Sequence, residues 1–265
     1  MFTLRHVLSI LFFVTFVSKT WAIDPALIPG VDPGSLKDAV VEDSNRNGVL
    51  ELAAFGDSIT FGIGDEVGPE RGYPLRLEQY FAVGVTNLGD PGEKLTTEGV
   101  RRYIQTIPGV NPDLVTIGEG TNDAFFSISS AVYQRSVQML INYTRGLGAI
   151  PVLVTAPPAC CGRVVANNGA IKRYNEILRS LAAVNAVPLA EVNQAFRNSC
   201  PEIDQCNLID TDGIHPNSLG YDIMGEVVSA TYLGIDLLAE GNATKLEKAL
   251  RLPEGSVKTL PTVEG

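Results

Sequence analysis

Five short apolar runs, each separated from the next by a longer stretch of helical character, constrain the fold of this chain more than any other feature. Short apolar runs suit buried strands, and helices between successive strands return the chain so that the strands run parallel. We therefore expect an α/β protein with a five-stranded, mostly parallel sheet flanked by helices. The five runs are residues 49–55, 83–88, 114–117, 150–154 and 187–190.

Two of the intervening stretches carry clear helix signals. Residues 170–184 place apolar side chains at three- and four-residue spacing, which gives a helix one face for packing in the core. A second helix is expected over residues 130–147, with Ser129 or Ser130 as its N-cap. The stripe of the first helix consists of Ile171, Tyr174, Ile177, Leu178 and Leu181.

The N-terminal segment differs from the rest of the chain. Residues 1–22 carry Arg5 and His6, then an apolar run too short to span a bilayer comfortably, then small or polar residues ending at Ala22. This order is typical of a secretory signal peptide that is cleaved after Ala22, and an uncleaved membrane anchor is the alternative. We therefore expect a secreted or periplasmic protein.

The mature chain is expected to hold one domain. Residues 23–48 are rich in Pro, Gly, Asp and Asn and form an irregular lead-in, and residues 49–240 form the domain. Residues 241–265 are expected to be a polar tail, with room for one short helix before the chain becomes disordered. Asn142 and Asn242 lie in N-x-T sequons, which carry glycans only if the source organism glycosylates them.

The charge of the chain limits its partners. Cleavage of the signal peptide removes Arg5 and Lys19 but no acidic residue, so the formal charge changes from −10 to −12. An acidic surface repels polyanions, which argues against nucleic acid as a partner. No second apolar segment is long enough to cross a bilayer and no lipid-anchor signal ends the chain, so we expect no stable membrane anchor after cleavage.

The four cysteines all lie in the mature chain, and export makes disulfides the default expectation. A Cys200–Cys206 bridge would close the short loop CPEIDQC, whereas the adjacent Cys160 and Cys161 are awkward partners for each other and can instead reach that loop. Their spacing fits no usual zinc pattern, and the stretch DSNRNG at residues 43–48 lacks the closing carboxylate of a calcium loop. We expect no metal ion and no other cofactor.

The stretch FGDSIT contains a candidate nucleophile, Ser58, where an apolar strand ends and a turn begins. The chain has two histidines, and His6 leaves with the signal peptide, so an imidazole base must be His215. Asp212 precedes it by three residues, a spacing at which one turn aims the carboxylate at Nδ1 and leaves Nε2 to accept the serine proton. These residues indicate a serine hydrolase.

Four ordered motifs then resemble those of the SGNH hydrolases, also called the GDSL lipase/esterase family. They are GDSIT with Ser58, NLGDPG with Gly89, GTND with Asn122, and DGIHP with Asp212 and His215, over about residues 50–233. The resemblance implies a three-layer, flavodoxin-like α/β sandwich and a catalytic Ser58, Asp212 and His215. It also fits the absence of the G-x-S-x-G nucleophile elbow, since Thr60 stands where that motif has its second glycine.

An oxyanion hole is expected from three of these motifs. Ser58, Gly89 and Asn122 each follow the end of a different expected strand, and ligands bind outside the carboxyl ends of parallel strands. The backbone N–H groups of Ser58 and Gly89, with the side-chain amide of Asn122, can therefore converge on a carbonyl oxygen that gains charge.

The substrate is less constrained than the reaction. Phe125 and Phe126 follow Asn122 closely and are candidate walls of an acyl pocket, with burial in the core as the alternative. We expect an exported esterase that acts on small acyl groups, including acetyl groups on carbohydrate. Alternatives are a lipase, phospholipase or thioesterase of the same family, or a noncatalytic carbohydrate-binding protein on this fold.

Overall fold

Five parallel strands form a single sheet in the computed structural model, which describes residues 41–66, 72–239 and 241–257. The order across the sheet is β2-β1-β3-β4-β5, and every neighbouring pair is parallel, as expected. The strands are β1 (Glu51–Gly56), β2 (Gly84–Gly89), β3 (Leu114–Gly118), β4 (Ile150–Val154) and β5 (Leu189–Ala190). The expected signal peptide and most of the lead-in lie outside the described residues.

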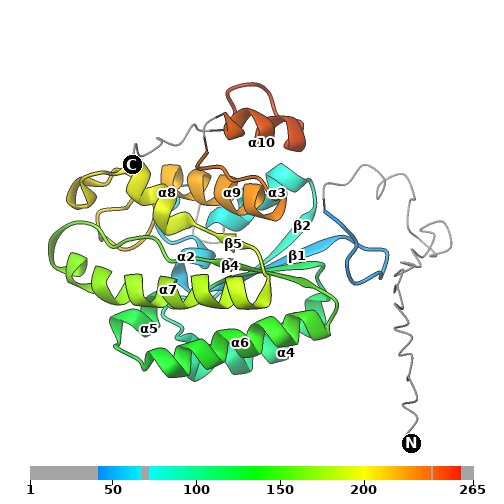
Figure 1. Cartoon of the computed structure of the whole chain (residues 1–265), viewed down its shortest axis with the longest axis horizontal. Coiled ribbons are helices and arrows are strands. Elements are labelled where there is room, and N and C mark those ends of the chain that lie inside the picture. Colours follow the sequence, from blue (N-terminus) through cyan, green and yellow to red (C-terminus); the bar gives the residue numbers. More distant parts are fainter. Residues whose placement is uncertain (1–40, 67–71, 240, 258–265) are drawn as a thin grey trace, which may run out of the picture.

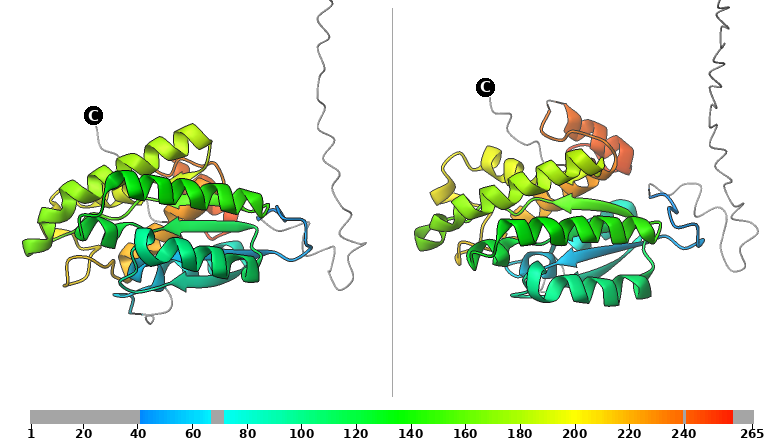
Figure 2. Two further views of the ribbon diagram at one scale, coloured as in Figure 1. Left: turned by 90° about the horizontal axis from the view of Figure 1, so that it is seen from below. Right: turned by 60° about the horizontal axis from the view of Figure 1, so that its bottom comes forward.

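Helices cover both faces of this sheet (Figure 1). One face carries α4 (Val100–Val110), α5 (Thr121–Phe125), α6 (Ser130–Gly146) and α7 (Asn168–Asn185). The other carries α3 (Gly72–Phe81), α8 (Val192–Ser199), α9 (Ser218–Tyr232) and α10 (Asn242–Leu250). Helices α6 and α7 run side by side, as both views in Figure 2 show. The arrangement is the expected three-layer α/β sandwich.

The alternation of side chains along β1 explains why both faces are covered. Leu52 and Ala54 belong to the core under α3, α8 and α9, whereas Ala53 and Phe55 belong to the core under α4, α6 and α7. All four side chains are buried. Because successive residues of a strand point to opposite faces, a strand that is apolar throughout must be covered on both sides.

Helix α7 follows the predicted stripe. Ile171, Tyr174, Leu178 and Leu181 are buried, and the helix extends by a few residues beyond each predicted end, from Asn168 to Asn185. Helix α6 likewise begins at Ser130 with Ser129 as its N-cap residue. The periodicity of residues 170–184 therefore predicted which face of α7 packs on the sheet.

The segment after Gly241 differs from the expected polar tail. Helix α10 places Leu246 and Leu250 in the same core as α9, and Val257 beyond it is buried there too. The Asn242 side chain is mostly buried and donates from Nδ2 to the Asp236 carbonyl at 2.6 Å. Residues up to Val257 thus extend the domain, and the buried Asn242 amide is a poor glycan acceptor.

Both disulfides in the structure join cysteines that are close in sequence, one or six residues apart. Cys200 and Cys206 form the expected bridge that closes the short loop. Cys160 and Cys161 are bonded to each other, so the expectation that they are awkward partners was wrong. The local backbone permits this adjacent pairing, with Cys161 in the left-handed region at a φ of 63°.

Candidate active site

Ser58 occupies the sharp turn that follows β1, an interior strand of the sheet. The strand ends at Gly56, and the short helix α2 (Ser58–Phe61) begins with Asp57 as its N-cap, whose Oδ1 accepts from Ile59 N–H at 2.9 Å. A Cβ atom on Gly56 would lie 2.0 Å from Thr60 Oγ1 and 2.4 Å from the Gly118 carbonyl, so only glycine fits. The tight turn leaves Ser58 with 9% exposure at the carboxyl edge of the sheet.

The predicted trio comes together at this edge. His215 Nε2 lies 2.8 Å from Ser58 Oγ, and His215 Nδ1 lies 2.5 Å from Asp212 Oδ2. The other oxygen of Asp212 accepts from the backbone N–H groups of Ile214 and His215, at 2.8 and 3.0 Å. One tight turn thus aims the carboxylate at the ring, as the three-residue spacing predicts.

Asp212 is held in its ionised form. Partial burial would raise the pKa of its carboxyl group, but the hydrogen bonds from the ring and backbone of His215 and from Ile214 outweigh burial and lower that pKa below its ordinary value. A charged Asp212 keeps the Nδ1 proton on the side of the ring away from Ser58. Nε2 of the neutral ring is then the acceptor.

The loop with Asp212 and His215 is anchored to the segment with the adjacent cysteines. Cys160 N–H donates to the Gly213 carbonyl at 2.8 Å. Gly213 has a φ of 77°, and a Cβ atom there would lie 2.2 Å from the Cys160 carbonyl oxygen. This close approach needs glycine. It fixes the backbone between the carboxylate and the imidazole.

Asn122 lies in α5, just beyond β3. Its Nδ2 donates to the Glu93 carbonyl at 2.9 Å, which leaves the second amide hydrogen for another acceptor. The neighbouring Asp123 is fully buried and accepts from Leu95 N–H and from the N–H and hydroxyl of Thr96. Asp123 therefore ties the 93–96 segment to α5 and sets the position of Asn122.

Gly89 is the last residue of β2 and lies close to α2. Its N–H donates to Asn87 Oδ1 at 2.9 Å, and a Cβ atom on Gly89 would lie 2.1 Å from Phe61 N. Gly89 therefore allows the end of β2 to pack tightly against α2, and its N–H is already engaged. The role of Gly89 in an oxyanion hole therefore stays a prediction, and the second glycine of the NLGDPG motif is a competing backbone donor.

The second glycine of that motif, Gly92, is in a different environment. It has a φ of 85°, and a Cβ atom there would meet nothing within 4 Å. The turn is attached to the site on both sides, since Asp90 N–H donates to the Gly56 carbonyl and the Glu93 carbonyl accepts from Asn122. A Pro-Gly pair favours a turn with positive φ at glycine, and this was the available sequence signal.

Buried carboxyl groups lie behind the nucleophile, a feature that the sequence analysis missed. Burial and the charges of Asp57 and Glu93 raise the pKa of Glu119 well above its ordinary value, which favours the neutral acid. Glu93 is itself paired with Arg102, whose Nε donates to it at 2.8 Å. The available signal was a charged residue, Glu119, placed directly after an apolar strand.

Asp57 combines its capping role with an electrostatic cost. Burial raises the pKa of its carboxyl group to about 6 despite the hydrogen bond from Ile59 N–H. In the described part of the chain its second oxygen, Oδ2, is buried and accepts no hydrogen bond. A carboxyl group whose pKa is higher in the folded than in the unfolded protein contributes stability that is fully present below the unfolded pKa. That stability is lost as the pH rises through the folded pKa.

We therefore predict that Asp57→Asn stabilises the protein at pH 8 but not at pH 4. Asparagine keeps the capping oxygen and removes the buried charge, which is worth about 3 kcal/mol for a shift of this size. Urea unfolding of both proteins at the two pH values measures the difference. Equal changes in the free energy of unfolding at pH 4 and pH 8 would contradict an ionised Asp57 in the fold.

The two phenylalanines after Asn122 differ in burial. Phe125 is partly buried and packs against the core under α4, α6 and α7. Phe126 is 66% exposed, and Lys94 Nζ lies 5.1 Å from the centre of its ring. Of the two, Phe126 is the one with an exposed apolar surface, and its contact with substrate stays a prediction. Phe125 contributes to the core.

The described residues include neither a membrane-spanning helix nor a clustered metal-binding site. Within 41–66, 72–239 and 241–257, no helix combines the length and apolar character needed to cross a membrane. Over the same ranges, His, Cys, Asp and Glu side chains form no group of three or more arranged to hold a metal ion.

Comparison with known proteins places this geometry in context. The model of the GDSL-like lipase/acylhydrolase family matches residues 54–223. A curated relative, a multidomain esterase from Ruminococcus flavefaciens, is 23% identical over 250 residues, which cover 79% of this chain and 32% of that protein. This chain therefore spans about a third of the length of that relative.

Solved structures with similar folds extend the comparison. A lipase/acylhydrolase from Enterococcus faecalis superimposes with a TM-score of 0.60 at 26% identity, over 68% of this chain and 93% of that one. A catalytic mutant of an acetylxylan esterase from Geobacillus stearothermophilus gives a TM-score of 0.59 at 19% identity, over 71% and 95%. At 19% identity the likeness is one of fold.

Proposed function

Because this chain belongs to the GDSL-like lipase/acylhydrolase family, we propose that it is an exported serine esterase that hydrolyses carboxylic esters of small acyl groups, including acetyl esters of carbohydrate. The observation that carries the proposal is the continuous path from Asp212 through His215 to Ser58 Oγ. The names of the similar esterases from Ruminococcus flavefaciens and Geobacillus stearothermophilus support the substrate class.

The first half of the reaction transfers the acyl group to the protein. His215 Nε2 takes the proton of Ser58 Oγ as that oxygen bonds to the ester carbonyl carbon, and the carbonyl electrons move onto its oxygen. When the tetrahedral intermediate collapses, the C–O bond to the alcohol breaks and His215 gives its proton to the leaving alcohol. Asp212, still ionised, stabilises the imidazolium between these two transfers.

Three N–H groups are proposed to bind the oxyanion. The Ser58 N–H opens α2, Asn122 has an amide hydrogen that the Glu93 carbonyl does not use, and Gly92 replaces Gly89 as the backbone donor. Gly92 is the better candidate because its Cβ position faces open space and its turn lies between the strand end at Gly56 and Asn122. Donors fixed before the reaction cost no reorganisation when charge develops.

The second half of the reaction releases the acid. Water gives a proton to His215 Nε2 and attacks the acyl carbon, and the bond to Ser58 Oγ breaks as that oxygen recovers the proton. The net change is one ester and one water converted to one acid and one alcohol. No step calls for a cofactor.

We predict that Asn122→Ala lowers kcat by about 10²- to 10³-fold and leaves KM nearly unchanged, because an oxyanion donor acts mainly in the transition state. Steady-state kinetics and melting temperature should be measured on one preparation. Asn142→Ala, at an exposed asparagine of α6, is the matched control and should leave kcat unchanged. Lower thermal stability of Asn122→Ala with ordinary turnover would instead indicate a purely structural contact with Glu93.

The substrate class is tested by a chain-length series of p-nitrophenyl esters together with acetylated xylo-oligosaccharides. We expect the highest kcat/KM with acetate and a steady fall as the acyl chain lengthens, because the described part of the site includes little apolar surface beyond Phe126. Faster turnover of long chains would favour a lipase, and preference for thioesters a thioesterase. Binding of carbohydrate without hydrolysis of any ester would refute the esterase proposal.

A further inference from the structure

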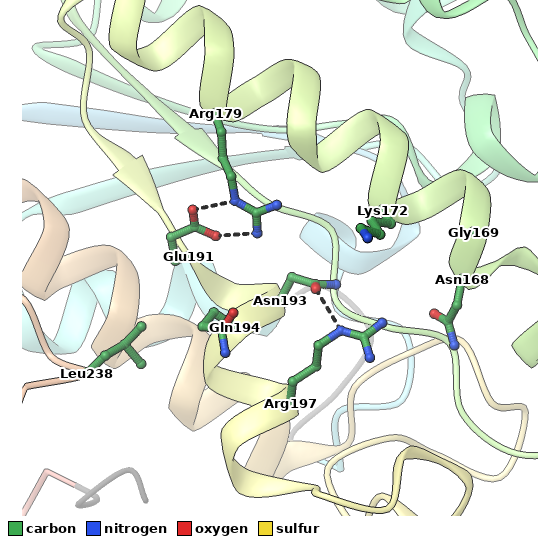
Figure 3. A pocket seen from close by; sticks show the side chains of 9 residues that line it. All are labelled: Asn168, Gly169, Lys172, Arg179, Glu191, Asn193, Gln194, Arg197 and Leu238. Atoms are coloured by element: carbon green, nitrogen blue, oxygen red, sulfur yellow. Dashed lines mark hydrogen bonds and ion pairs between the residues drawn. The ribbon is translucent and has the colours of Figure 1, made fainter. Parts of the chain in front are cut away.

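A pocket outside the candidate active site lies between α7, α8 and the segment that follows α9. Its volume is about 750 Å³. Figure 3 shows side chains from the first half of α7 facing those of α8 across it, with Leu238 at one side. None of the residues proposed for ester hydrolysis lines it. A concave site of this volume suits a ligand with one or more rings, because an inorganic ion fills only a small part of it.

The charges around this pocket do not cancel. Arg179 is paired with Glu191 through two hydrogen bonds of 2.8 Å, so these two side chains are neutral together. Lys172 lies 3.9 Å from Glu176, and both are exposed enough that water weakens the attraction. Arg197 forms no ion pair with any acidic residue in the described part of the chain. The pocket therefore keeps excess positive charge in a chain whose formal charge is −10.

Arg197 is held in place before any ligand arrives. Its Nε donates to Asn193 Oδ1 at 3.1 Å. Asn193 is 6% exposed, and it donates from its backbone N–H to Thr155 Oγ1 and from Nδ2 to the Ala156 carbonyl. This buried asparagine fixes the guanidinium, whose two terminal nitrogens extend toward Asn168 in Figure 3.

We infer that this pocket binds the carboxylate of an acidic sugar unit in a carbohydrate ligand, with Arg197 as its principal contact. A guanidinium held at Nε presents its terminal N–H groups as a planar fork, which matches the two oxygens of a carboxylate. The aliphatic stems of Lys172 and Arg179 and the side chain of Leu238 supply apolar surface for a sugar ring. The choice of a sugar as the carrier of the carboxylate rests on the proposed function.

The test is isothermal titration calorimetry on the Ser58→Ala protein with trigalacturonate, the neutral xylotriose and inorganic phosphate as separate ligands. The proposal expects binding of trigalacturonate that weakens with added salt, and much weaker binding of the other two. Arg197→Gln should lower the affinity for trigalacturonate by about 10- to 100-fold, the range for a charged hydrogen-bonded pair. Arg101→Gln on α4 makes the same change in net charge at an exposed position and should leave affinity unchanged.

Each result bears on the inference. Equal affinity for xylotriose and trigalacturonate would overturn the carboxylate site, equal affinity for phosphate would reduce it to a general anion site, and no binding at all would refute it. Arg197→Gln should retain full activity on p-nitrophenyl acetate in an otherwise wild-type chain, which rules out misfolding. Because calorimetry measures binding without turnover, it can detect binding of trigalacturonate even if the protein proves not to be an esterase.

Discussion

Replacement of Ser58 by alanine is expected to lower kcat for p-nitrophenyl acetate by roughly 10⁴- to 10⁶-fold. The Oγ atom forms the bond to the acyl group, and no other hydroxyl in the described part of the chain lies within hydrogen-bonding distance of His215 Nε2. The residual rate comes from the oxyanion donors and from substrate binding. The fold should be retained, because within the described part of the chain the one hydrogen bond of Ser58 Oγ is that to the imidazole.

Covalent labelling gives an independent readout of the same prediction. An organophosphonate ester should modify the wild-type protein once, at the peptide that contains Ser58, and should not modify Ser58→Ala. Ser180→Ala, at an exposed serine of α7, is the matched control and should be labelled and active like the wild type. A label on any other residue, or hydrolysis that persists in Ser58→Ala, would overturn the assignment of the nucleophile.

The second large effect is expected from Asp212→Asn, with kcat lowered by roughly 10⁴-fold. An asparagine amide can donate to His215 Nδ1 and so stabilise the tautomer with its proton on Nε2, where it blocks transfer from Ser58. It also removes the charge that stabilises the imidazolium.

The matched control and the double variant make this prediction specific. Asp210→Asn lies two residues away, and its side chain contacts only Thr211 in the described part of the chain, so its kcat should stay near that of the wild type. If Ser58, His215 and Asp212 act as one unit, Ser58→Ala/Asp212→Asn should be no slower than Ser58→Ala alone. An additive loss in the double variant would mean that Asp212 supports the fold and not the proton transfer.

Much of this arrangement could be predicted because its signals are local. Each apolar run is long enough to form one strand of the sheet, and the helices between runs require the strands to be parallel. The carboxyl ends of the strands then lie at one edge of the sheet. The positions of Ser58 and Asn122 at that edge followed from the strand ends alone. With His6 assigned to the expected signal peptide, His215 was the one histidine left as the base. The spacing of Asp212 and His215 needs only one turn, which is also local.

The features that escaped prediction depend on contacts between segments distant in sequence. Gly89 and Gly92 are three residues apart in one motif, and only the packing of β2 against Phe61 shows that the first serves a close approach and the second an open turn. Likewise, α10 appears polar by composition, but its two leucines meet a core made by α9 and the sheet.

The sequence by itself therefore determined the sheet, the candidate nucleophile, its base and the carboxylate that orients the base, because hydrophobic periodicity and short spacings act within one element or one turn. Tertiary structure decided which group engages the Gly89 N–H, how the cysteines pair, and that Arg197 is fixed by a buried Asn193 in a pocket of its own. These depend on which atoms compete for the same partner after folding, and that competition exists only once remote segments have been brought together.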